Sequence, residues 1–417
     1  MPTTEEKGRL AAQKPLSQLT FVDMDVIGCP YHAYKRLREE APVFLDPVGG
    51  FYVVTRYDDI SRALKDTATF SNDELMPREE YDRPVQYGGL PAVDTMITTD
   101  PPKHKFYRAP LNKVFSAKRI NGMEAYVQQI IDELIDGFID DGRVDFVKQY
   151  TVPLPMFVIA DQLGVPRSDL EKFARWSDAI ATQVSGFATE DDKINSAKEM
   201  VQMQKYFLKV IEEKTKNPTD DIISDLINVR LEDGKPMRDV DLLSTINLLL
   251  AAGNETTTNS MSLAMLTLLE HPEQMQALQN DLSLIEAFTE ESLRFNSPVQ
   301  GLMRRAKHDT EIGGVAIPKN SIINLRFASG NRDESKYTES ETFNICRKDD
   351  TVHLAFGQGT HFCIGANLAR KEIHLTFRTL LTRMRNIRLL GDKDDLVYER
   401  NVVLRALKSL NLAFDKA

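Results

Sequence analysis

The sequence contains few cysteines. Only Cys29, Cys346 and Cys363 occur in 417 residues, and they form an odd, widely spaced set. Disulfide frameworks need paired cysteines and persist mainly in oxidising compartments. The sequence therefore predicts no disulfide framework and favours a cytoplasmic protein, in which Cys363 would act as a thiol or thiolate.

Positive charge and long apolar runs are scarce as well. The chain has 52 Lys and Arg against 62 Asp and Glu, a formal net charge of -10. Nucleic acid or an anionic membrane would need a basic surface. The longest apolar run, residues 246–253, is far shorter than the ~18 to 20 residues that span a bilayer. The first seven residues carry mixed charges and no apolar signal segment. We expect no nucleic acid, no membrane and no export.

Linkers and repeats are also missing. The chain has no internal repeat, no low-complexity segment and no Gly/Ser linker, and its 42% hydrophobic content supports a sizeable core. We therefore expect a flexible N-terminal arm at residues 1–20, followed by one domain at residues 21–417.

Helical periodicity dominates the chain, with small β regions near both ends. Helices are predicted at residues 31–40, 58–65, 103–115, 117–139, 154–163, 168–185, 190–216 and 242–270. Strands are predicted at residues 43–45, 51–54, 322–327, 396–404 and 410–414, and a hairpin is predicted at residues 311–320. Residues 71–99 show little periodicity and read as a long binding loop or lid. The fold class is mainly α with small β regions.

The predicted helix at residues 242–270 has an unusual middle. It includes Gly253, and a mid-helix glycine costs about 1 kcal/mol relative to alanine. One interpretation is that Ala251, Ala252 and Gly253 let a ligand or dioxygen approach the backbone, while Glu255 and Thr256 supply an acid and a hydroxyl for proton transfer. The alternative is that Asn254 caps a second helix or that the hydroxyls bond to carbonyls one turn earlier.

The segment Phe356–Gly365 has the spacing Phe-Gly-x-Gly-x-x-x-Cys-x-Gly. Composition alone would produce it roughly 2 times in 100,000 such sequences. A helical pattern follows, which places Cys363 at a helix N-terminus, where a thiolate metal ligand is favoured. A structural cysteine would not explain the glycines, a zinc site lacks a Cys-x-x-Cys pair, and His361 is awkwardly placed to activate a nucleophile.

This segment resembles the haem-binding loop of cytochrome P450 monooxygenases, in which the cysteine thiolate is the iron ligand. Two further segments are similar to motifs of that family, in the same order along the chain. Ala252-Gly253-Asn254-Glu255-Thr256 resembles the oxygen-binding segment, and Glu291-Ser292-Leu293-Arg294 resembles the Glu-x-x-Arg ion pair that braces the core. The resemblance covers roughly residues 28 to 415.

The resemblance implies the family's fold, a triangular helical prism with a long central helix, and a haem b (iron protoporphyrin IX) cofactor. Cys363 would be the iron ligand. His104, Arg108, Arg304 and His361 would hold the haem propionates, which need cations or donors. Further residues expected to contact the haem are Phe356, Gly365, Ala252 and Gly253.

The resemblance also implies the insertion of one oxygen atom of O2 into an apolar small molecule. Cys363 would donate electron density, and Thr256 and Glu255 would deliver protons. As in similar bacterial proteins, electrons would come from an iron–sulfur ferredoxin and its reductase, and so indirectly from NAD(P)H, to a cytoplasmic monomer. A terpenoid, a steroid, a fatty chain and an alkylated aromatic all suit the mainly aliphatic candidate pocket residues. These are Leu90, Met96, Ile97, Phe187, Leu248, Ala251, Ala252, Val299, Leu302 and Val403, drawn partly from the region 184–187.

Other functions are possible on the same residues. A peroxide-driven haem-thiolate peroxygenase would not need the Glu255–Thr256 pair. A haem-based ligand sensor without turnover would need neither that pair nor the loop at residues 71–99. A helical scaffold without haem would leave the glycines around Cys363 unexplained.

Overall fold

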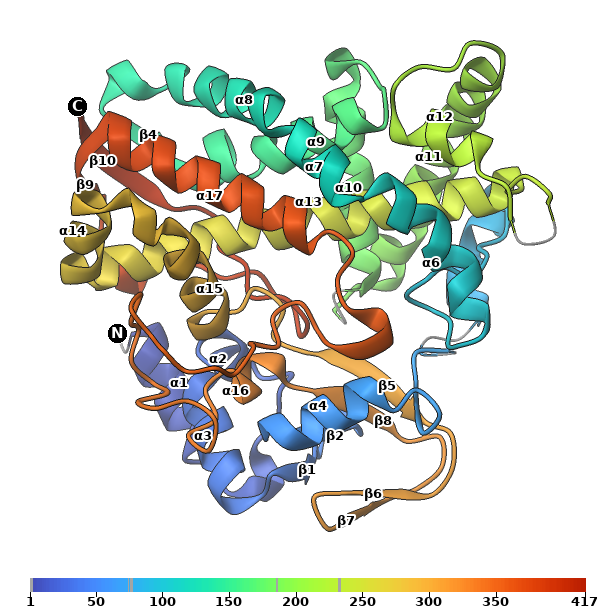
Figure 1. The fold of residues 1–417 in the computed structure, drawn as a ribbon. Helices are drawn as coiled ribbons and strands as arrows, with labels where there is room; N and C mark the ends of the chain where they lie inside the picture. Colours follow the sequence, from blue (N-terminus) through green and yellow to red (C-terminus); the bar gives the residue numbers. More distant parts are fainter. Residues whose placement is uncertain (1–2, 74, 76–77, 185–186, 232–233) are drawn as a thin grey trace. The chain divides into compact units, whose positions relative to one another are not determined.

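A computed structural model of the protein describes residues 3–73, 75, 78–184, 187–231 and 234–417 (Figure 1). The chain packs as two compact units, each assembled from separate stretches of sequence. Unit 1 comprises the residues up to Ser71, Ile131–Val152 and Thr256–Ala417, and unit 2 comprises Asn72–Ile130 and Pro153–Glu255. A single domain at residues 21–417 stays a prediction.

Unit 1 contains all the strands that the structure describes. Its largest sheet is mixed, in the order β1-β2-β8-β5-β3, with β2 and β8 parallel and the other neighbours antiparallel. A second sheet has the order β4-β10-β9, and β6 pairs with β7. The strands are β1 (Val43–Leu45), β2 (Tyr52–Val54), β3 (Phe70–Ser71), β4 (Arg143–Asp145), β5 (Leu302–Ala306), β6 (Thr310–Ile312), β7 (Val315–Ile317), β8 (Ile322–Leu325), β9 (Met384–Leu389) and β10 (Asn411–Lys416).

The β6–β7 hairpin shows why these residues turn where they do. Gly313 and Gly314 have φ of 56° and 81°, and a two-residue hairpin turn with positive φ at both positions favours glycine. The apolar side chains of this sheet region then pack into a core that includes Ile312, Ile317 and Ile323. The predicted hairpin is confirmed.

The helices of unit 1 are α1 (Thr4–Ala12), α2 (Met24–Gly28), α3 (Tyr31–Glu40), α4 (Tyr57–Lys65), α14 (Pro272–Asn280), α15 (Ile285–Phe295), α16 (Phe327–Gly330) and α17 (Ala366–Arg383). Of these helices, α4 and α16 contribute side chains to the core that includes Ile312, Ile317 and Ile323. Unit 2 is helical, with α5 (Arg78–Tyr81), α6 (Lys103–Val114), α7 (Ala117–Gly122), α9 (Pro153–Gln162), α10 (Leu170–Val184), α11 (Glu190–Lys216) and α12 (Ile222–Asn228). α8 (Glu124–Asp136) and α13 (Asp239–Glu270) continue from one unit into the other.

Short helical turns connect these elements. They are η1 (Leu16–Gln18), η2 (Arg83–Tyr87), η3 (Ile139–Asp141), η4 (Val147–Thr151), η5 (Arg167–Asp169), η6 (Leu282–Leu284), η7 (Gly359–His361) and η8 (Lys393–Asp395). The loop predicted at residues 71–99 thus contains α5 and η2. The strand predicted at residues 396–404 is wrong, because the backbone there makes only isolated bridges, such as Val299 with Leu404.

The flexible arm predicted at residues 1–20 is also corrected. The Thr3 hydroxyl accepts a hydrogen bond from the Glu6 N–H, and the Glu6 carboxylate accepts one from the Thr3 N–H, each at 3.0 Å. This capping box starts α1, and Ala11, Ala12 and Leu19 are buried in a core cluster of unit 1. Residues 3–20 are therefore packed.

Candidate active site

The Cys363 loop has a backbone that requires glycine. Gly357 and Gly359 have φ of 67° and 69°. A Cβ on Gly359 would lie 2.9 Å from the Leu64 carbonyl oxygen, so a side chain there would collide with the chain behind it. The Cys363 N–H donates to the Phe356 carbonyl at 2.9 Å and closes the loop.

Cys363 lies where its sulfur can be reached. Its side chain is exposed, and it forms no disulfide. Gly365 is the N-cap of α17, an 18-residue helix, and a Cβ on that glycine would be 3.9 Å from the Cys363 sulfur. The thiol thus sits over the start of the helix, where the free N–H groups and the helix dipole favour a thiolate.

Phe356 is supported by a polar cluster beneath the loop. The Arg370 guanidinium lies 4.5 Å from the centre of the Phe356 ring, and its nitrogens donate to Glu290 at 2.6 and 2.8 Å. His353 lies 3.2 Å from the same carboxylate. Burial alone would raise the pKa of Glu290, but the hydrogen bonds from Arg370 and His353 outweigh it and lower that pKa to about 2. Glu290 is therefore an anion over the whole range in which the protein would work.

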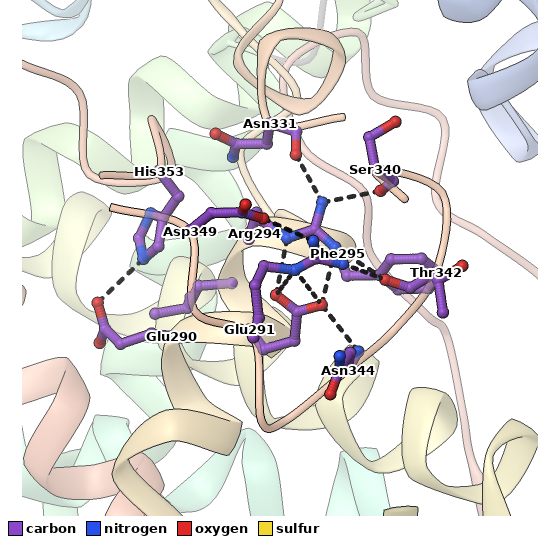
Figure 2. A network of polar contacts seen from close by, with 12 residues as sticks. Glu290, Glu291, Arg294, Phe295, Asn331, Ser340, Thr342, Asn344, Asp349 and His353 are labelled. Atoms are coloured by element: carbon purple, nitrogen blue, oxygen red, sulfur yellow. Dashed lines mark hydrogen bonds and ion pairs between the residues drawn. The ribbon is translucent and has the colours of Figure 1, made fainter. Parts of the chain in front are cut away.

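The Glu291–Arg294 pair is buried and fully bonded. The Arg294 side chain donates to both Glu291 carboxylate oxygens, at 2.7 and 2.8 Å. Figure 2 shows the same guanidinium pointing at three backbone carbonyls, those of Asn331 (2.8 Å), Ser340 (2.9 Å) and Thr342 (3.1 Å). The ion pair that the family resemblance implied is present, and it ties α15 to the chain at residues 331–342.

Two partners of this pair were not predicted. Arg347 donates to Glu291 at 3.0 and 3.2 Å, and the Asn344 N–H donates to it at 2.9 Å. Glu291 thus balances two arginines. Arg347 lies 56 residues from Glu291 in the sequence, and no local pattern connects the two.

Two predicted propionate donors lie in unit 1. Arg304 is buried on β5, where the residue is 2% exposed, and it donates to the Met303 carbonyl at 2.7 Å. His361 ends η7, two residues before Cys363. The other two predicted donors lie in unit 2, one turn apart on α6. His104 is buried there, and Arg108 donates to the Asn112 side chain at 3.0 Å.

The middle of α13 is accessible although most of the helix is buried. The helix is continuous, so Asn254 does not cap a second one, and its side-chain amide donates instead to the Ser177 hydroxyl at 3.1 Å. Ala252 and Gly253 are exposed, and a Cβ on Gly253 would meet nothing within 4 Å. Back-bonding does occur further along, where the Ser260 hydroxyl donates to the Thr256 carbonyl at 2.8 Å.

The candidate pocket residues fall into two sets. Val299 and Val403, in unit 1, lie on neighbouring turns, because the Gln300 N–H donates to the Val403 carbonyl at 2.7 Å and Val299 bridges to Leu404. Leu302, on β5, is 41% exposed. The set in unit 2 ranges from buried to exposed side chains and comprises Leu90, Met96, Ile97, Phe187, Leu248, Ala251 and Ala252. Ser185 and Gly186, in the region 184–187, lie outside the described residues.

Comparison with known proteins decides the family. The sequence model of the cytochrome P450 family matches residues 187–412. The chain is 33% identical over 388 residues to cytochrome P450 107B1 of Saccharopolyspora erythraea, covering 91% of this chain and 94% of that protein. It belongs to the cytochrome P450 family.

Two other P450s extend the comparison. The steroid C26-monooxygenase of Mycobacterium tuberculosis is 34% identical over 382 residues, covering 92% of this chain and 93% of that protein. The crystal structure of CYP109E1 from Bacillus megaterium in complex with testosterone superimposes with a TM-score of 0.81 at 33% identity, covering 92% of this chain and 99% of that one. The mainly helical P450 fold and the monooxygenase class that we predicted are confirmed.

The residues of this P450 fit the haem that its family implies. Within unit 1 alone, the chain supplies one accessible soft sulfur, Cys363, the buried Arg304 and the imidazole of His361, which are the kinds of group that an iron and a propionate require. Within the described ranges, three or more His, Cys, Asp or Glu side chains nowhere gather as a separate metal site. No helix in those ranges has the length and apolar character to cross a membrane.

Proposed function

We propose that this P450 inserts one oxygen atom of O2 into a C–H bond of an apolar small molecule. The observation that carries the proposal is the accessible Cys363 thiol at the start of α17, on a loop whose glycines have positive φ. This backbone presents one sulfur outward, which would suit a ligand of the haem iron and does not suit a core cysteine.

Each residue has a defined part in this proposal. Cys363 would hold the iron, and Arg304, His361, His104 and Arg108 would hold the propionates. When bound, the haem supplies the activation of dioxygen. The Thr256 hydroxyl would hold a proton at Oγ1 for transfer, and the Glu255 carboxyl group would take a proton from solvent and pass it on to replace that one.

The partners follow from the bacterial P450s that the chain resembles. A ferredoxin and its reductase would pass electrons from NAD(P)H to a cytoplasmic monomer. For the substrate, a steroid is the first class to test, because one relative is named a steroid C26-monooxygenase and one structural neighbour holds testosterone. Aliphatic candidates such as Leu248 and Val403 support an apolar substrate.

The haem-thiolate proposal is tested by the spectrum of dithionite-reduced protein under carbon monoxide. We expect a band at about 450 nm, which Cys363→Ser should abolish together with turnover. Cys346→Ser is the matched control, since Cys346 is also exposed, and it should keep the band. Native protein that binds no haem would contradict the proposal.

The substrate class is tested by titrating the ferric protein with a panel of steroids, terpenoids, fatty acids and alkylated aromatics. A ligand that displaces water from the iron shifts the haem from low to high spin. A spin shift with fatty acids and none with testosterone would remove the steroid from the proposal.

The proton role of Thr256 is tested by Thr256→Ala. We expect unchanged substrate binding, and about a tenfold lower product yield per electron as electrons are diverted to peroxide. Thr256→Ser retains the hydroxyl and should restore the yield. Equal yields in all three proteins would remove Thr256 from the proton path and would revive the peroxygenase, which should then turn over with hydrogen peroxide alone.

A further inference from the structure

The 80–90 segment, residues Glu80–Leu90, lies along one face of α11 within unit 2. The α11 residues that face it recur every three to five positions, as expected for one stripe of a helix. The facing pairs are Arg83 with Glu190, Glu80 with Lys193, Tyr87 with Lys198, Gly89 with Val201 and Leu90 with Gln204.

The first half of this contact is ionic and partly exposed, with the Arg83 and Glu80 side chains 16% and 27% exposed. Arg83 donates to Glu190 and, at 3.1 Å, to Glu80, whose carboxylate also accepts from Lys193 at 3.0 Å. The Glu190 side chain is 65% exposed. Exposed ion pairs are screened by salt and hold a side chain loosely.

The second half is a directional clamp made by one side chain. The Leu90 N–H donates to Gln204 Oε1 at 2.8 Å, and Gln204 Nε2 donates to the Leu90 carbonyl at 3.1 Å. The backbone N–H and the backbone carbonyl of Leu90 thus both hydrogen-bond to the side-chain amide of Gln204. Only Asn and Gln side chains carry an N–H donor and a carbonyl acceptor together, and the longer Gln reaches further from the helix.

Gly89 provides an independent sign that this approach is close. A Cβ on Gly89 would lie 2.7 Å from Gln204 Oε1, 2.8 Å from Val201 Cγ2 and 3.0 Å from the Pro84 carbonyl oxygen. Val201 is buried, so it cannot swing away without repacking. The segment can therefore reach Gln204 only because residue 89 has no side chain.

We propose that Gln204 is a positioning residue that fixes Leu90 and thereby controls how ligands enter the pocket. This inference rests on the proposed function, because Leu90 is one of the candidate pocket residues. Fixing both polar groups of residue 90 orients its side chain, and it ties the 80–90 segment to the longest helix of unit 2. Moving Leu90 away from α11 requires both hydrogen bonds to break.

The first test is fragment-resolved hydrogen–deuterium exchange on the holoenzyme. Gln204→Met removes both hydrogen bonds at similar size, and it should speed exchange of the Leu90 amide by about 10-fold while the interior of α11 is unchanged. Gln202→Met is the matched control, since Gln202 is exposed on the same helix, and it should change nothing.

Gln204→Glu separates the two bonds. A carboxylate can still accept from the Leu90 N–H, but it cannot donate to the Leu90 carbonyl. We expect the exchange rate of the Leu90 amide in Gln204→Glu to lie between the rates in the native protein and in Gln204→Met. Gly89→Ala disturbs the same contact while Gln204 is kept, because the added Cβ would collide with Gln204 and Val201. It should therefore also raise the exchange rate of the Leu90 amide.

The second test measures access directly, as the association rate of 4-phenylimidazole with the ferric haem. Gln204→Met and Gly89→Ala should each raise this association rate about threefold or more, and Gln202→Met should match the native protein.

An unchanged exchange rate of the Leu90 amide in Gln204→Met would overturn the clamp. Faster exchange with an unchanged association rate would overturn its control of access. Failure of the proposed function would show differently, as native protein without a haem band, and exchange at Leu90 would still decide whether the clamp exists.

Discussion

The Glu291–Arg294 pair and the Arg83–Glu190 pair are both contacts between a carboxylate and a guanidinium, yet their surroundings differ. The side chains of Glu291 and Arg294 are 4% and 3% exposed, and backbone groups and the Arg347 side chain are their other partners. The side chains of Arg83 and Glu190 are 16% and 65% exposed. The first pair joins elements of unit 1, and the second holds a loop to α11.

The difference shows which contacts can be opened. A buried pair that loses one partner leaves an uncompensated charge away from water, at a cost of about 3–5 kcal/mol. An exposed pair that opens is rehydrated, and its loss costs about 1 kcal/mol or less. The buried Glu291–Arg294 pair therefore suits a permanent brace, and the pair at the 80–90 segment suits a part that can open at low cost.

The largest expected effect is that of Glu291→Gln. This change leaves Arg294 and Arg347 without their shared anion, and it should lower the free energy of unfolding by about 3–5 kcal/mol. Urea unfolding of the holoenzyme, followed by circular dichroism and by haem absorption, measures it. Glu212→Gln is the matched control, because Glu212 pairs with Lys216 on the surface of α11 and both side chains are at least 67% exposed. Equal urea midpoints for Glu291→Gln and Glu212→Gln would mean that the buried Glu291–Arg294 pair contributes no more to stability than the surface Glu212–Lys216 pair.

Glu372 sharpens the comparison, because it is buried on α17 without a partner for Oε2 in the part of the chain that the structure describes. Burial raises the pKa of its carboxyl to about 8. The folded protein then keeps a proton that the unfolded chain loses near pH 4.5, so stability falls as pH rises from about 4.5 to 8. We expect Glu372→Gln to flatten this fall and to stabilise the protein at pH 8 by up to about 4 kcal/mol.

The measurement is the urea midpoint of both proteins at pH 5, 6, 7 and 8. Glu273→Gln, at an exposed position on α14, should leave the pH dependence as it is. Parallel curves for the native protein and Glu372→Gln would mean that Glu372 is ionised in the fold.

The same two regions show what a sequence can predict. The i,i+3 spacing of Glu291 and Arg294 and the glycines around Cys363 are local, because a helix turn and a positive φ are decided by neighbouring residues. The pairing of Leu90 with Gln204 joins positions 114 residues apart, and no period connects them. The loop at residues 71–99 was therefore recognisable, but its partner was not. For α1 the signal was present, since Thr3 and Glu6 have capping-box spacing.

The smallest expected effect is that of Arg83→Gln, and it separates the ionic half of the α11 contact from the Gln204 clamp. Removing Arg83 from Glu80 and Glu190 should destabilise the protein by about 1 kcal/mol or less, because Glu190 is largely exposed and Glu80 keeps its second partner, Lys193. Exchange near residue 83 should rise about two- to threefold at low salt and by less in 0.5 M NaCl, where screening already weakens the native pairs.

Lys209→Gln removes the same charge from an exposed position of α11, so it reports any general effect of net charge. Leu90 should stay protected in Arg83→Gln, because its two hydrogen bonds go to Gln204. If Leu90 exchange instead rises as much as in Gln204→Met, the ion pairs and the clamp open as one unit, and the exposed half of the contact contributes more than its exposure predicts.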